Sequence, residues 1–176
     1  ILIFYVILNF LYFSFFKKII ILDAFILMIF YLIRVISGHI VNDIVFSIWL
    51  LSFVFFIFLS LSFLKKFTDI KITNADNRIL EYKKNHFQIL QIFGIGSSVI
   101  SAAIIILYST SKSIKLLYSN EYILLLVSPI ILFWSLNTWL MGIRGFIKMD
   151  PVSFVLKQKY TYLCLILIII ILFIAK

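Results

Sequence analysis

The residues best suited to chemistry form one charged stretch at the end of a long apolar run, Lys65-Lys66-Phe67-Thr68-Asp69. If a helix continues through this stretch, Lys65, Lys66 and Asp69 share one face, because residues three and four apart are neighbours on a helix. Two ammonium groups beside a carboxylate can hold a phosphate group together with a divalent metal ion. The alternative is a helix end whose lysines extend among lipid headgroups without any chemistry. The spacing leaves both readings open.

Asp23 is the second candidate, because it is the carboxylate placed well inside an apolar run. An ionised side chain in a membrane span costs about 2.5–3.5 kcal/mol on insertion scales, so it normally has a partner or a task. Asp23 follows Lys17 and Lys18 closely in the chain. This position predicts either a salt bridge to one of these lysines or a role for Asp23 as a ligand.

Two further polar positions have structural explanations. Arg34 lies sixteen residues after Lys18, about 24 Å along a helix, so we expect it at the opposite end of its span and paired with Asp43. Asp150-Pro151 is typical of a helix start, with Asp150 as the N-cap and Pro151 as the first helical residue. We therefore expect a short helix over Val152–Lys159.

The composition requires a membrane around these residues. Of 176 residues, 64% are apolar and 13% are charged, whereas soluble domains are typically about 45–50% apolar and about 25% charged. So few polar residues cannot cover a water-exposed surface, which excludes a soluble enzyme, a secreted disulfide scaffold and a disordered tail. The net charge of +9 is carried mostly between the apolar runs. It therefore reports orientation in the bilayer and not a nucleic-acid partner.

The apolar runs predict an all-α, polytopic membrane bundle in a single domain over residues 1–176. A helix needs about 20 apolar residues to cross a bilayer, and the runs do not alternate apolar and polar residues as barrel strands would. The chain begins inside an apolar run, at Ile1, so we expect an N-terminal part of the protein to be missing. The six expected spans are Ile1–Phe16, Ile19–Gly38, Ile44–Leu64, Phe87–Tyr108, Tyr122–Gly142 and Tyr160–Ala175.

The charges between the spans predict the orientation. The first, third and fifth connections carry twelve basic residues, against two in the second and fourth. Cytoplasmic loops are enriched in lysine and arginine, so we expect the odd connections in the cytoplasm. The longest of them is 65–86. For a bacterial protein this means the inner, cytoplasmic membrane.

Taken in order, these residues resemble the UbiA superfamily of intramembrane prenyltransferases, and most closely its polyprenyl-phosphate phosphoribosyltransferase branch. The charged stretch falls where that branch usually shows K-R-x-x-E, with Lys66 in place of arginine and Asp69 in place of glutamate. The resemblance covers essentially the whole chain. The other matching residues are Tyr12, Lys17, Asp23, Ile33-Arg34, Gly38, Ser47, Trp49, Arg78, Tyr82 and Asp150-Pro151-Val152.

The resemblance implies a fold of nine membrane helices, of which this chain would supply the last six. The loop 65–86 would then be the active-site loop. The resemblance gives Asp69 and Lys66 catalytic roles, and it gives Lys65, Lys17 and Arg78 contacts to phosphate. Asp69 and Asp23 would bind Mg²⁺. The second acidic motif of the family, N-D-x-x-D-x-x-x-D, lies near the second helix and is absent here, as expected if three helices are missing.

The implied reaction transfers phosphoribosyl from phosphoribosyl pyrophosphate to a polyprenyl phosphate with magnesium, in synthesis of the cell envelope. The partners would be that lipid and the phosphorylated sugar donor. The rival reaction in the same superfamily transfers a prenyl group from its diphosphate to an aromatic or other acceptor. A transporter or a non-catalytic membrane subunit is the alternative from another class. Because the carboxylates of this chain are few and dispersed, we expect the 176 residues alone to be inactive.

Overall fold

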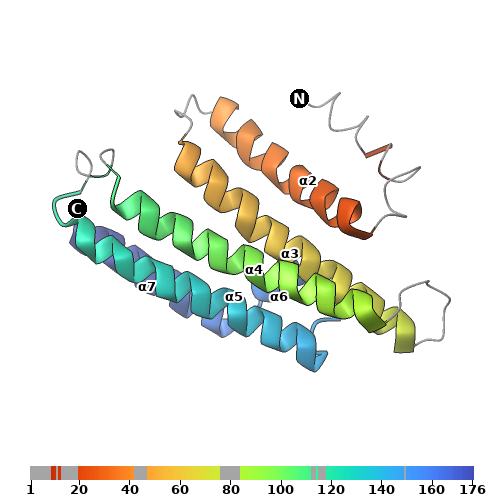
Figure 1. Cartoon of the computed structure of the whole chain (residues 1–176). Helices are drawn as coiled ribbons and strands as arrows, with labels where there is room; N and C mark the ends of the chain where they lie inside the picture. Colours follow the sequence, from red (N-terminus) through yellow and green to blue (C-terminus); the bar gives the residue numbers. More distant parts are fainter. Residues whose placement is uncertain are drawn as a thin grey trace.

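The protein is a bundle of helices in the computed structural model, which describes residues 9, 10, 12, 20–41, 47–75, 84–111, 114, 118–148 and 150–176. In these residues every regular element is a helix (Figure 1). The elements are α2 (Ile20–Val41), α3 (Ile48–Ala75), α4 (Lys84–Ser109), the 3-10 helix η3 (Glu121–Leu126), α5 (Val127–Arg144), α6 (Pro151–Val155) and α7 (Lys159–Ala175).

Four segments of these helices are long and apolar enough to cross a membrane, which confirms the expected all-α membrane bundle. They are Ile21–Val41, Ile48–Ile72, Phe87–Ser109 and Glu121–Arg144. They correspond to the second, third, fourth and fifth predicted spans. α7 corresponds to the sixth but is shorter, with 17 residues. Most of the first predicted span lies outside the described residues, so the count of six spans stays a prediction.

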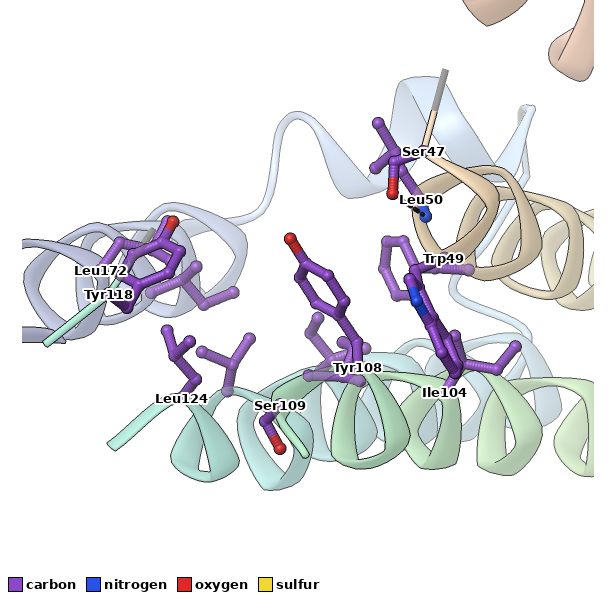
Figure 2. A pocket seen from close by; sticks show the side chains of 14 residues that line it. Ser47, Trp49, Leu50, Ile104, Tyr108, Ser109, Tyr118, Leu124 and Leu172 are labelled. Atoms are coloured by element: carbon purple, nitrogen blue, oxygen red, sulfur yellow. Dashed lines mark hydrogen bonds between the residues drawn. The ribbon is translucent and has the colours of Figure 1, made fainter. Parts of the chain in front are cut away.

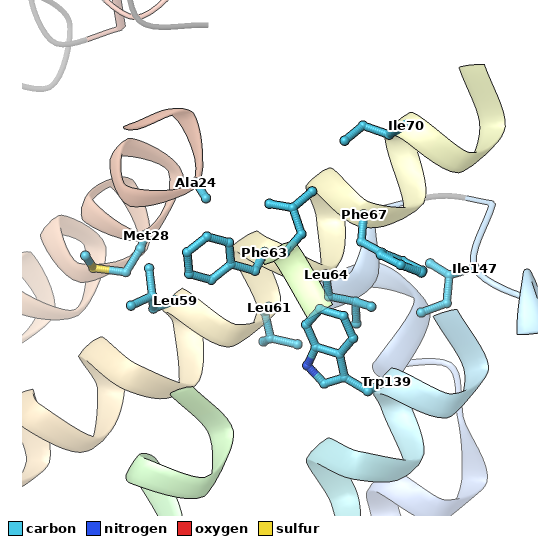
Figure 3. Packing of buried hydrophobic residues seen from close by; sticks show 11 residues of the cluster. Ala24, Met28, Leu59, Leu61, Phe63, Leu64, Phe67, Ile70, Trp139 and Ile147 are labelled. Atoms are coloured by element: carbon cyan, nitrogen blue, oxygen red, sulfur yellow. The ribbon is translucent and has the colours of Figure 1, made fainter. Parts of the chain in front are cut away.

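α3 is the central helix of the bundle, with α2 on one side and α4 on the other (Figure 1). α5 and α7 pack beyond α4. The core around α3 holds Phe63 and Leu64 together with Trp139 of α5, all almost fully buried (Figure 3). Figure 3 shows Phe63 directed toward α2 and Trp139 packed below Leu64. The buried indole of Trp139 donates a 2.9 Å hydrogen bond to Ser60 Oγ, so no polar atom of this ring is left unpaired in the core.

A glycine allows α4 to approach this tryptophan. A Cβ atom built on Gly94 would lie 2.0 Å from Cζ2 of Trp139, a distance that no side chain can occupy. Gly94 therefore permits the close helix packing for which membrane bundles use small residues. Gly96 has no such role, because a Cβ atom there would meet nothing within 4 Å.

The helix ends around the fifth connection follow the rules of capping. α5 ends at Gly145, whose φ of 83° is readily adopted by glycine, and the next residue, Phe146, donates to the carbonyl of Met141 at 3.0 Å. α6 begins as the sequence predicts: Asp150 Oδ2 accepts a hydrogen bond from the amide of Ser153 at 3.4 Å, and proline occupies the first helical position. The predicted length of this helix is wrong, since α6 ends at Val155.

The bundle has two ends that the contacts define. At one end, Lys65 of α3 pairs with Asp150 before α6, so the third and fifth connections lie together, as the charge pattern predicts. We call this the charged end. At the far end, the amide of Asn120 donates to the carbonyl of Ala175 at 3.1 Å, which joins the fourth connection to the end of α7. The cytoplasmic placement of the charged end stays a prediction.

Candidate functional site

Five ionisable side chains from three parts of the chain meet at the charged end. α2 contributes Asp23, α3 contributes Lys65, Lys66 and Asp69, and the N-cap of α6 contributes Asp150. We call these five residues the charge cluster. It contains Lys65, Lys66 and Asp69, the charged residues selected from the sequence, and α3 continues past all three to Ala75. Because the helix continues through the charged stretch, Lys65, Lys66 and Asp69 can share one helical face.

The innermost part of the cluster is an ion pair between Lys66 Nζ and Asp23 Oδ2. Asp23 is 1% exposed and the side chain of Lys66 is 10% exposed. The other carboxylate oxygen, Asp23 Oδ1, is buried and has no hydrogen-bond partner among the described residues. Both oxygens of a buried carboxylate normally accept hydrogen bonds. Asp23 Oδ1 can therefore still accept one from a ligand or a water molecule.

This pair gives Asp23 a partner that the sequence did not predict. Lys17 and Lys18, its predicted partners, lie outside the described residues. The partner that the structure shows is Lys66, on the neighbouring helix. Asp23 is thus placed beside the charged stretch, which also brings the two residues of the predicted ligand role, Asp23 and Asp69, to the same end of the bundle.

The outer part of the cluster is the pair between Lys65 Nζ and Asp150 Oδ1, 3.1 Å apart. About a third of each side chain is exposed, so this pair can exchange partners more easily than the buried one. Asp150 has two tasks, because its other oxygen caps α6. Lys65 also interacts electrostatically with Tyr31 of α2.

Asp69 lies on the exposed side of the cluster. It interacts electrostatically with both lysines and with the carboxylates of Asp23 and Asp150. Three carboxylates and two ammonium groups give the cluster a formal charge of −1. A phosphate group would therefore be attracted only if it arrived with a cation or if it displaced a carboxylate from one of the lysines.

The described residues do not by themselves form the predicted magnesium site. No three His, Cys, Asp or Glu side chains within the described ranges are grouped closely enough to hold a metal ion. Asp23 and Asp150 are each engaged by a lysine. Mg²⁺ normally takes one or two carboxylates together with substrate phosphates and water, and the cluster could offer Asp69 in such a shell. The magnesium requirement stays a prediction.

Other predicted residues are not part of the cluster as the structure describes it. Lys17 and Arg78 lie outside the described residues. Arg34 is three residues after Tyr31 on α2, and its guanidinium carbon lies 5.6 Å from the centre of that ring. Its predicted partner, Asp43, lies outside the described residues. Arg34 therefore has an aromatic contact that the sequence analysis did not predict.

Two residues near the cluster, Tyr31 and Lys71, make contacts that the sequence did not predict. The only sequence signal of Tyr31 is a polar atom in an apolar run. The ammonium group of Lys71 donates to the carbonyl of Ile143 in the last turn of α5. Lysines near a helix C-terminus satisfy such carbonyls, but the sequence does not show which helix end lies beside α3.

An apolar groove begins within one helical turn of the outer ion pair. Its volume is about 310 Å³, and its walls come from α3, α5, α6 and α7. Leu61, one turn before Lys65, and Val152, two residues after Asp150, both line it. A charged head and an apolar groove are therefore adjacent, an arrangement that suits an amphiphile.

Comparison with known proteins gives one distant relative. The chain is 24% identical over 151 residues to the "Uncharacterized protein y4nM" of Sinorhizobium fredii (strain NBRC 101917 / NGR234). The alignment covers 83% of this chain and 29% of that protein, so the chain spans less than a third of its relative's length. No model of a known protein family matches the chain, and no solved structure matches it.

Proposed function

We propose that this chain belongs to an integral membrane transferase of the UbiA type and that its charge cluster binds the phosphate of a lipid substrate. The observation that supports this most is that the Lys65–Asp150 pair lies within one helical turn of an apolar groove. A lipid phosphate needs both parts: positive charge for its head and an apolar surface for its tail. The resemblance of the charged stretch to K-R-x-x-E gives the same assignment independently of the contacts.

The two lysines would have different tasks in this proposal. Lys65 is partly exposed, so it could leave Asp150 and contact a phosphate oxygen when the lipid arrives. Lys66 is held by Asp23 in the interior, so it would provide a fixed positive charge behind the phosphate. Asp69, on the exposed side, would face a cation that accompanies the substrate.

The reaction we propose is phosphoribosyl transfer. A phosphate oxygen of the polyprenyl phosphate would attack the anomeric carbon of phosphoribosyl pyrophosphate. The bond from that carbon to the pyrophosphate oxygen would break, and pyrophosphate would leave with the bonding electrons. Magnesium supplies charge neutralisation for the leaving group in such reactions. Prenyl transfer from a prenyl diphosphate is the second candidate, since its donor also has a phosphate head and an apolar tail.

A binding experiment tests the shared part of both reactions. The 176-residue chain in phosphatidylcholine nanodiscs is titrated with a radiolabelled polyprenyl phosphate in the presence of magnesium. Lys65→Met should weaken binding about tenfold to a hundredfold, because a hydrogen bond to a charged group is lost. Lys157→Met is the matched control: Lys157 is exposed and follows α6, so its loss should leave the affinity unchanged.

Two results would contradict the proposal. One is equal weakening by both variants, which would mean a diffuse attraction to positive charge. The other is unchanged binding in Lys65→Met, which would mean that the cluster only anchors the helix ends. A turnover assay with radiolabelled phosphoribosyl pyrophosphate, run on the protein with its expected N-terminal part restored, then separates the two reactions, since only phosphoribosyl transfer places that label on the lipid.

A further inference from the structure

A second cavity lies at the far end of the bundle (Figure 2). Its volume is about 320 Å³, and it is bounded by the start of α3, the last turns of α4, the start of α5 and the end of α7. Trp49, at the start of α3, lies sixteen residues before Lys65 on the same helix, which is about 24 Å along the axis. This cavity is therefore separate from the charge cluster and from the groove beside it.

Among the residues that the structure describes, none of those that line the cavity is charged. The residues that line it are apolar or carry a neutral hydroxyl or indole group: Ser47, Trp49, Leu50, Phe53, Ile104, Ile105, Tyr108, Ser109, Tyr118, Leu124, Val127, Ile131, Ile168 and Leu172. An ionised ligand would lose its hydration here without gaining a partner of opposite charge, at a cost of several kcal/mol. The chemistry of the walls therefore favours an uncharged ligand.

One polar group is placed to hold such a ligand. Figure 2 shows the hydroxyl of Tyr108 directed into the open space between Tyr118 and Ser47. The Tyr108 ring is fixed against Trp49, with 6.2 Å between the ring centroids. Its hydroxyl forms no hydrogen bond to any side chain that the structure describes, whereas Ser47 Oγ already accepts from the amide of Leu50 at 3.4 Å. Tyr108 thus offers one free donor and acceptor in an apolar cavity.

The position of the cavity also indicates the source of its ligand. Aromatic side chains such as Trp49 and Tyr108 collect at the border between hydrocarbon and headgroups. A ligand with its polar head at this border and its chain along Ile104 and Leu172 would enter from the bilayer. An apolar cavity of this kind does not hold ordered water well, so a lipid chain is the suitable occupant.

We infer that this cavity binds an uncharged single-chain amphiphile of the membrane, with an oxygen head group on Tyr108 and an apolar chain between α4 and α7. A long-chain alcohol has this chemistry. The inference does not depend on the proposed transferase, because it concerns another end of the bundle and another class of ligand.

Photolabelling tests this inference on the 176-residue chain in phosphatidylcholine nanodiscs. The probe is a hexadecanol that carries a diazirine in its chain, and mass spectrometry locates the label. We expect saturable labelling of the segments around Ile104 and Leu172, competed by unlabelled hexadecanol. Tyr108→Phe should weaken the apparent affinity about threefold to tenfold, because one neutral hydrogen bond is lost.

Filling the cavity provides a matched pair of variants. Ile104→Trp places a larger side chain in the cavity and should abolish saturable labelling. Ile106→Trp makes the same change two residues away on an exposed position that does not line the cavity, and labelling should persist. If Ile104→Trp does not fold, Leu172→Trp takes its place, and Tyr108→Phe still tests the hydrogen bond with little change of volume.

Two outcomes would overturn the inference. One is equal labelling of the same segments by a phosphatidylcholine with the diazirine in its acyl chain, since the cavity would then be filled by ordinary bilayer lipid. The other is unchanged affinity in Tyr108→Phe, since the alcohol head would then not be recognised.

Discussion

Lys66 of α3 and Asp23 of α2 form an ion pair in which both side chains are almost fully removed from the surface. A buried pair of this kind contributes little net stability, because the desolvation of two charges offsets their attraction. Removing only one of the two partners is strongly destabilising, since the remaining buried charge has no counter-charge. The pair therefore fixes how α2 and α3 are placed relative to each other at the charged end.

The first prediction concerns this pair. Asp23→Ala should lower the free energy of unfolding by about 3–5 kcal/mol, because Lys66 would stay buried without a counter-charge. The double variant Asp23→Leu with Lys66→Met should recover most of this loss, since neither charge remains. Unfolding in a denaturing detergent, followed by circular dichroism, measures both. A double variant as unstable as Asp23→Ala would show that the pair contributes net stability after all.

The second prediction compares the two partners of the outer pair. Lys65→Ala should cost less than about 1 kcal/mol, because a partly exposed ion pair is screened by water. Asp150→Ala should cost about 1 kcal/mol more, because it also removes the N-cap of α6. Asp150→Asn keeps a capping oxygen and should behave like Lys65→Ala. The same unfolding assay ranks the three variants, and equal losses in Asp150→Ala and Asp150→Asn would contradict the capping role.

The third prediction uses two glycines of α4 as a matched pair. Gly94→Ala should destabilise the bundle by about 1–3 kcal/mol, since its methyl group would overlap the ring of Trp139. Gly96→Ala should be neutral or stabilising by up to about 1 kcal/mol, because there is open space around it and alanine favours the helix. Thermal melting of both variants in the same detergent provides the comparison. Equal melting temperatures would mean that α4 is not packed against Trp139.

The fourth prediction concerns topology. Single cysteines at Ile72 and at Val41, in a background where the buried Cys164 is replaced by alanine, should react with a membrane-impermeant maleimide from opposite sides of the membrane. The reason is that α3, which lies between these positions, is long and apolar enough to cross the bilayer. By the charge pattern, the cysteine at Ile72 should be labelled from the cytoplasm. Labelling of both cysteines from one side would contradict the span and the orientation together.

The sequence by itself determined the class of fold and the position of the charged stretch. Apolar runs of about 20 residues between basic connections leave few arrangements other than a membrane bundle, because each backbone polar group must be satisfied within its own helix. The start of α6 was also predictable, since Asp150 and Pro151 satisfy a local rule that needs no other part of the chain. Local rules did not predict where this helix ends, since α6 stops four residues earlier than expected.

Only the tertiary structure decided which residues meet. The sequence predicted Lys17 or Lys18 as a partner of Asp23, and both lie outside the described residues. The partner that the structure shows is Lys66, because α2 and α3 are antiparallel neighbours and their charged ends coincide. Helical spacing predicts contacts along one helix but contains no information about which face of the next helix lies opposite. The same reason explains why the contact of Lys71 with the last turn of α5 and the far-end cavity around Tyr108 had no sequence signal. Pairing between helices depends on how their side chains interlock, and that is a property of the packed bundle.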